Sequence, residues 1–167
     1  MIAAVTQTLI EILVENSPLI GYVEIDLNHP QTRYEIQPSA FASPALSVYL
    51  YRLAESKYKY PKSCYYQLNK QNYLVEWYDL SFAIIPWERT VLGQWQLLSE
   101  VIRTLIPYRS IAENKLAPEL RGFGNLPLKI ATSLPSNGES HQNSSSFFYP
   151  ALYITIQTPF SVAKIQS

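Results

Sequence analysis

The fold of this chain is decided by the stretch LVEWYDLSFAIIPWERTVLGQWQLLSEVIRTLI, which covers residues 74–106. Residues 74–85 alternate between two faces, and from Leu80 onward both faces are largely apolar. A strand that is apolar on both faces is typical of the centre of a sheet that is covered on both sides. We therefore predict a central strand over 74–85, which Pro86 ends because its ring has no N–H for a central ladder.

The second half of the stretch has the period of an amphipathic helix. We predict a helix over Val91–Ile106, ended by Pro107. Its buried stripe is expected to contain Val91, Leu92, Trp95, Leu98, Val101, Ile102, Leu105 and Ile106. Its solvated face is expected to contain Gln94, Gln96, Glu100 and Arg103. Gly93 costs this helix about 1 kcal/mol relative to Ala, which indicates close backbone packing at that position.

Length and charge exclude several classes of protein. The chain has 167 residues, with 13 basic and 13 acidic side chains that cancel. This length is typical of one domain with one core, and the neutral charge argues against a nucleic acid or an anionic membrane as the main partner. Charged residues are scarce and 13 residues are Tyr, which is typical of protein–protein interfaces. Tyr residues that border the core would give the same composition.

The targeting and redox signals favour a reduced compartment. Cys64 is the one cysteine, so an internal disulfide is impossible. We interpret it as structural, because no His or acidic residue lies near it in the sequence. The first residues lack a basic segment and contain Glu11, which does not fit a signal peptide. With no apolar run of membrane-spanning length, we expect a soluble, cytoplasmic protein with no direct membrane span.

The remaining patterns complete a single α+β domain over residues 1–167. We expect an N-terminal helix over 2–15 and the long second helix to pack on a mixed or antiparallel sheet of about five strands. Besides the central strand, alternation predicts strands over 22–27, 45–53, 126–131 and 149–158. The connecting segments are expected to be a loop over 28–44, a polar hairpin-like excursion over 56–72, a flexible loop over 136–146 and a tail over 159–167.

No motif in the sequence points to catalysis, a metal or a cofactor. His29 and His141 lie far apart in Pro- or Ser-rich segments, so we interpret them as turn or solvent residues. Glu76 and Asp79 project to opposite faces of the central strand and do not form a catalytic pair. Gly122-Phe123-Gly124 lacks the further residues of a phosphate loop and is interpreted as a turn. A triad distant in sequence keeps an unrecognised enzyme using His29 or His141 as one alternative.

The excursion over 57–66 interleaves lysines with tyrosines, in the style of single-stranded nucleic-acid platforms. It contains few lysines and no arginine, and it lies in a neutral chain. We therefore interpret it as a solvated hairpin or a loop that docks a partner. The candidate interface residues are Tyr58, Tyr60, Tyr65 and Tyr66 of this excursion, with Pro159 and Phe160 of the tail.

Several hydrophobic segments, in their order, resemble a known family. They are Met1–Val5 with Leu9 and Leu13, the segment PALSVYLYRLAES at 44–56, Leu80–Trp87 leading to Leu92-Gly93, Leu105-Ile106-Pro107, and FYPALY at 148–153. Together they resemble the tail-terminator, or cap, proteins of extracellular contractile injection systems, which are phage-tail-like particles of the antifeeding-prophage and virulence-cassette type. The segment 109–124 does not align with the family.

The resemblance implies a structural role without catalytic, cofactor or metal residues. It implies a homo-oligomer, a six-fold ring at the end of the tail distal to the baseplate, with the inner-tube and sheath proteins as partners and no nucleic acid. Such a ring stops polymerisation of the inner tube and holds the last sheath ring. As a hypothesis, the tail over 159–167 or the excursion over 57–66 exchanges a strand with the sheath. An adaptor that docks to another large assembly remains the second alternative.

Overall fold

The computed structural model describes residues 1–30, 43–56, 64–68, 71–131 and 150–164. The expected flexible loop over 136–146 and most of the loop over 28–44 lie outside these ranges. The described helices are α1 (Ile2–Asn16) and α3 (Val91–Leu105), with short 3-10 turns η1 (Ile20–Tyr22), η2 (Glu113–Lys115) and η3 (Pro118–Leu120). The described strands are β1 (Glu24–Asp26), β2 (Ala45–Glu55), β3 (Cys64–Leu68), β4 (Gln71–Trp87), β5 (Ser110–Ile111), β6 (Leu126–Ala131) and β7 (Leu152–Lys164).

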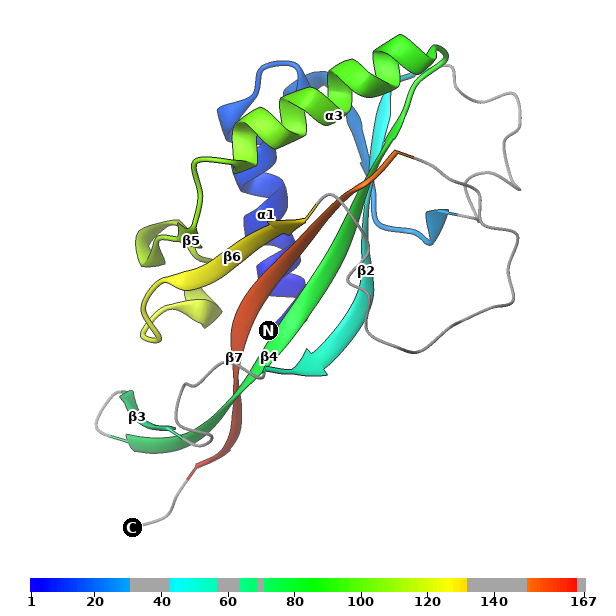
Figure 1. Ribbon diagram of the computed structural model, residues 1–167. Coiled ribbons are helices and arrows are strands. Elements are labelled where there is room, and N and C mark those ends of the chain that lie inside the picture. Colours follow the sequence, from blue (N-terminus) through cyan, green and yellow to red (C-terminus); the bar gives the residue numbers. More distant parts are fainter. Residues whose placement is uncertain (31–42, 57–63, 69–70, 132–149, 165–167) are drawn as a thin grey trace, which may run out of the picture.

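These seven strands form one curled sheet with β4 at its centre (Figure 1). The order is β1-β2-β4-β7-β6-β5, and β3 pairs with the first part of β4. β1 is parallel to β2 and the other pairs are antiparallel. The predicted α+β class and mixed sheet are therefore confirmed. The five predicted strands are all present, joined by β3 in the hairpin-like excursion and by the short β5.

Both helices pack on the same face of the sheet, where they build the main core. Leu80, Phe82 and Ile84 of β4 point into this core. α1 contributes Ala4, Val5, Leu9, Ile12 and Leu13, and α3 contributes Leu97, Val101 and Leu105. The sequence pattern predicted that the central strand is covered on both faces. The structure shows that α1 and α3 share one face.

The second face of the sheet carries a smaller apolar cluster. Ala45, Ala83, Ile85 and Trp87 are buried together there. The Trp87 Nε1–H donates to Ser47 Oγ at 2.7 Å, and the rings of Tyr51 and Tyr153 meet edge to face with centroids 5.7 Å apart. These two tyrosines are partly buried and pack against the cluster. For them, the interpretation that tyrosines border the core is confirmed.

The prediction that Pro86 ends the central strand is wrong, because β4 continues through Pro86 to Trp87. The Ser56 N–H donates to the Trp77 carbonyl at 2.9 Å, so the peptide groups of Trp77 face β2. Peptide groups alternate along a strand, and those of Pro86 therefore face β7. The pairing of β7 with β4 ends at Ile84. The missing N–H of Pro86 consequently removes no ladder bond.

The predicted helix is confirmed, but the prediction of which face it buries is only partly correct. α3 buries Leu97, Val101, Thr104 and Leu105, whereas Val91, Leu92, Trp95 and Ile106 are exposed. Relative to the predicted stripe, the buried face is rotated by about 100°, or one residue. Periodicity identifies an apolar arc, but it does not say which part of a wide arc meets the sheet.

Two glycine predictions have different outcomes. Gly122 and Gly124 have φ of 97° and 79°, which confirms the predicted turn. Gly93 lies in the first turn of α3, where its N–H donates to the N-cap Thr90 Oγ1. A Cβ at Gly93 would lie 2.2 Å from Glu88 Cγ, so the space is filled by a side chain and not by backbone as predicted.

The end of the chain also differs from its prediction. β7 continues to Lys164, whereas the sequence predicted a strand that ended at residue 158 and a tail from 159. Residues 159–164, apart from Val162 at a register shift, are therefore paired with β4, and residues 165–167 lie outside the described ranges.

The orientation of α3 generates the first prediction. We expect Leu97→Ala to lower the free energy of unfolding by about 2–5 kcal/mol, because it leaves a cavity under the helix. Trp95→Gln should lower it by less than about 1 kcal/mol, because this side chain is mostly in solvent. Urea unfolding of both variants measures the difference. The reverse order would show that α3 buries the originally predicted stripe.

A second prediction concerns the contact between α1 and η3. The Ala117 N–H donates at 3.1 Å to the hydroxyl of Thr8, which is fully buried. Thr8→Val keeps the shape but leaves this buried N–H without an acceptor, so we expect a loss of about 1–3 kcal/mol in unfolding free energy. Thr6→Val is the matched control on the same helix, because the Thr6 hydroxyl only donates to the Ile2 carbonyl one turn earlier. Equal losses in the two variants would contradict the role of Thr8.

Candidate interaction surfaces

The first candidate surface is a shallow open depression beside the outer face of α3, here called the α3 groove. Its apolar residues are Leu92 (64% exposed), Trp95 (56%) and Leu19 (46%). Its polar lining consists of Gln96, Ser99, Glu100 and Arg103. Exposed Trp and Arg are the residue types that carry much of the binding energy at protein interfaces. The helical period places Leu92 and Trp95 in the buried stripe, so the sequence alone did not indicate this surface.

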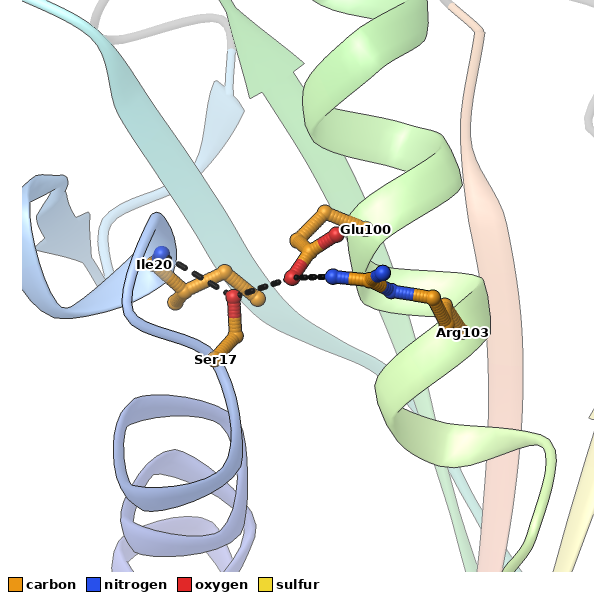
Figure 2. A network of polar contacts seen from close by, with 4 residues as sticks. All are labelled: Ser17, Ile20, Glu100 and Arg103. Atoms are coloured by element: carbon orange, nitrogen blue, oxygen red, sulfur yellow. Dashed lines mark hydrogen bonds and ion pairs between the residues drawn. The ribbon is translucent and has the colours of Figure 1, made fainter.

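A polar network connects the α3 groove to the end of α1 (Figure 2). The buried Ser17 hydroxyl donates to Glu100 Oε1 at 2.7 Å, and the Ile20 N–H donates to the Ser17 oxygen at 3.3 Å. Arg103 donates to the same Glu100 oxygen at 2.8 Å. The network ties the turn after α1 to the middle of α3 and positions Leu19 beside the helix.

The charges in this network are held in place by their partners. The hydrogen bond from Arg103, followed by that from Ser17, lowers the pKa of Glu100 below its ordinary value. The Glu100 side chain is 13% exposed, whereas the Arg103 side chain is 77% exposed. The guanidinium therefore presents its remaining donors to solvent at one end of the groove.

The second candidate surface is a projecting three-stranded extension of the sheet, here called the β-arm. It consists of β3, residues 71–75 of β4 and residues 161–164 of β7, and Figure 1 shows it extending away from both helices. β3 and the end of β7 pair with opposite edges of β4. The described parts of the two segments that contain the candidate interface residues are thus brought to the same part of the molecule.

The six candidate interface residues have different positions. Tyr65 and Tyr66 lie on β3, opposite Leu74 and Tyr73. Pro159 is buried at the base of the β-arm, and the half-buried Phe160 packs its ring edge to face on Tyr78 with centroids 5.2 Å apart. Tyr58 and Tyr60 lie outside the described residues. The assignment of these residues to an interface stays a prediction.

Of the residues considered for chemistry, those that the structure describes are not brought together. His29 is exposed and its ring lies 4.8 Å from that of Tyr49, while His141 lies outside the described ranges. Glu76 accepts a hydrogen bond from the Tyr78 hydroxyl at 3.2 Å, on the face of β4 opposite to Asp79. Within the described ranges, no three His, Cys, Asp or Glu side chains are grouped as a metal site. The helices described are too short or too polar to span a membrane.

Comparison with known proteins matches neither a protein family model nor a curated protein sequence. Among solved structures, the chain is similar to the tube-terminating cap of the anti-feeding prophage, determined by cryo-EM, with a TM-score of 0.61 and 18% identity. The alignment covers 98% of this chain and 56% of that cap chain. This chain therefore spans little more than half the length of the cap. The resemblance to cap proteins that the hydrophobic segments indicated is confirmed at the level of the fold.

The Ser17–Glu100–Arg103 network predicts a specific dependence of stability on pH. The pKa of Glu100 is lower in the folded chain than in the unfolded chain, so its carboxylate stabilises the fold above the unfolded pKa. This contribution is lost as the pH falls through the folded-state pKa. We expect Glu100→Gln to be less stable than the parent at neutral pH and to lose less stability on acidification below about pH 4.3. Urea unfolding across a pH series measures both effects.

Glu119→Gln is the matched control, because Glu119 is an exposed carboxylate outside the network. It should leave the pH profile of the parent unchanged. A Glu100→Gln profile parallel to that of the parent would show that the network does not hold the carboxylate in solution.

Proposed function

We propose that this protein is a structural cap, or tail terminator, of a phage-tail-like contractile injection system. In this proposal identical subunits form a ring, six-fold as in the family that the sequence resembles. The ring binds the last layer of the inner tube and of the sheath and prevents further subunits from adding. The protein is made and assembled in the cytoplasm and performs no catalysis.

The main support is the likeness of 98% of this chain to the tube-terminating cap of the anti-feeding prophage. The likeness extends over both helices and the whole described sheet, so it does not rest on one common motif. The sequence resemblance supports the same family independently, because it rests on the order of hydrophobic segments rather than on coordinates.

Two surfaces of the chain have the chemistry that a ring subunit needs. The α3 groove exposes Trp95 and Leu92 beside a charged rim. The β-arm extends two strand edges away from the core. A subunit of a closed ring contacts a neighbour on each side and its axial partners as well. The α3 groove and the β-arm provide two separate surfaces for such contacts.

The structure gives less support than the sequence to the hypothesis that the tail over 159–167 exchanges a strand with the sheath. Residues 159–164 already pair with residues 73–77 of β4. Donation of this segment to a sheath subunit would require those pairs to break first.

An adaptor domain of another large assembly is the second candidate, and the exposed Trp95 and Leu92 favour it to the same degree. Particle length separates the two functions. An adaptor leaves the length of tubes unchanged, whereas a terminator determines where they end.

The cap function predicts a change in particle length. Tube and sheath proteins of the host particle, assembled without this protein, should give particles with a broad distribution of lengths. Addition of the protein during assembly should restore a narrow distribution, because a bound ring covers the surface on which the next tube layer adds. Negative-stain electron microscopy of purified particles measures the distribution.

The Thr6→Val variant serves as the folded control and should restore length as the parent does. A narrow length distribution in the complete absence of the protein would contradict the cap function. Restored length with the protein bound along the particle and not at its end would contradict it as well.

A further inference from the structure

Among the residues that the structure describes, neither outer edge of the β-arm has a ladder partner, and the direction of its backbone groups can be derived from the hydrogen bonds at its base. The Trp77 carbonyl accepts from the Ser56 N–H, so alternate residues of β4, including Tyr73 and Val75, direct their peptide groups towards the side of β2 and β3. Val75 pairs with Cys64, and Tyr73 pairs with Tyr66. Along β3, the alternate residues Tyr65 and Gln67 therefore direct their N–H and C=O groups away from β4.

The opposite edge of the β-arm belongs to β7. β6 pairs with β7 only over residues 153–156, so the described residues provide no ladder partner on this edge beyond Ile156. Pro159 lies opposite Trp77, whose peptide groups face the other way, and its nitrogen therefore points outward. Proline on an edge strand stops a neighbouring strand from pairing there. The usable part of this edge begins beyond Pro159, at Ser161, and it faces away from β4, on the side of the β-arm opposite to β3.

The two open edges match one another. Both β3 and β7 run antiparallel to β4 and therefore parallel to each other. β3 is five residues long, and the segment opposite to it on β7 covers 161–164, where the register with β4 shifts by one residue at Val162. The chain has no net charge, so long-range repulsion does not oppose the approach of a second copy.

We propose that subunits of this protein join head to tail through the β-arm, with the outer edge of β3 in one subunit pairing in parallel with residues 161–164 in the next. In a ring, each subunit contacts its two neighbours through two different, complementary surfaces. Because neighbouring subunits are related by a rotation about the ring axis, β3 of one subunit can approach β7 of the next in the parallel orientation that the two strands have within one chain. A strand supplied by another protein would occupy one edge and leave the other unpaired. This proposal rests on the cap function, because it identifies the contact that would build the ring.

The native cysteine allows a direct test. Cys64 begins β3, and Ser161 lies two strands away across Val75. Neighbouring strands are about 4.8 Å apart, so the two Cα atoms of one chain are about 10 Å apart, beyond the reach of a disulfide. A disulfide between Cys64 and a cysteine at position 161 must therefore join two chains.

The experiment uses the purified full chain with Ser161→Cys, and with Val162→Cys or Lys164→Cys to cover the possible registers. After mild oxidation at high protein concentration, we expect at least one of these variants to give a ladder of dimers, trimers and larger species on a non-reducing gel. The ladder should end at the size of the closed ring. The parent, which contains Cys64 alone, should remain monomeric, and so should Cys64→Ser combined with Ser161→Cys.

The matched control is Glu119→Cys, which places a second cysteine at an exposed position outside both the β-arm and the α3 groove. It should give no ladder. Dimers in the single-cysteine proteins would overturn the proposal in favour of a two-fold contact, and the absence of a ladder in all registers would overturn it too. Thermal unfolding of each variant confirms that it is folded. If the ladder is absent while the protein still restores particle length, the β-arm contact is wrong and the cap function stands.

Discussion

The structure depends on β4 being paired along both of its edges. This strand is 17 residues long, and it pairs with β2 and β3 on one side and with β7 on the other. A strand with apolar residues on both faces is stable only when its backbone groups are satisfied by neighbours and its side chains are covered. Both helices are then required on the face of Leu80, Phe82 and Ile84, and the cluster around Trp87 forms on the other face.

α3 carries more apolar residues than its contact with the core requires, and the surplus lines the candidate surface called the α3 groove. Leu97, Val101 and Leu105 complete the core, which leaves Leu92 and Trp95 exposed next to Leu19. The Ser17–Glu100–Arg103 network holds this arrangement by fixing the turn after α1 to the helix. A large exposed aromatic residue beside an arginine on a rigid element is what an interface hot spot requires.

Two prolines lie within the long strands β4 and β7 of this sheet without breaking its ladders. Pro86 and Pro159 both lie within strands, and at both positions the missing N–H points to a side without a ladder partner among the described residues. At Pro86 this allows the central strand to continue towards α3. At Pro159 it separates the closed part of β7 from the open edge of the β-arm. The position of a proline relative to the ladder therefore decides its effect, because only every second residue directs its nitrogen to a given neighbour.

The sequence by itself determined the α+β class, both helices, the centre of the sheet and the likeness to cap proteins. The first three follow from local periodicity, because apolar patterns of this strength leave few alternatives, whereas the likeness rests on the resemblance of the hydrophobic segments to that family. Only the tertiary structure decided which part of the apolar arc of α3 is buried, that Pro86 and Pro159 lie within strands, and that β3 and the end of β7 share one arm. Each of these depends on which neighbour occupies a given edge or face, and contacts between segments far apart in the chain leave no periodic signal in a single sequence.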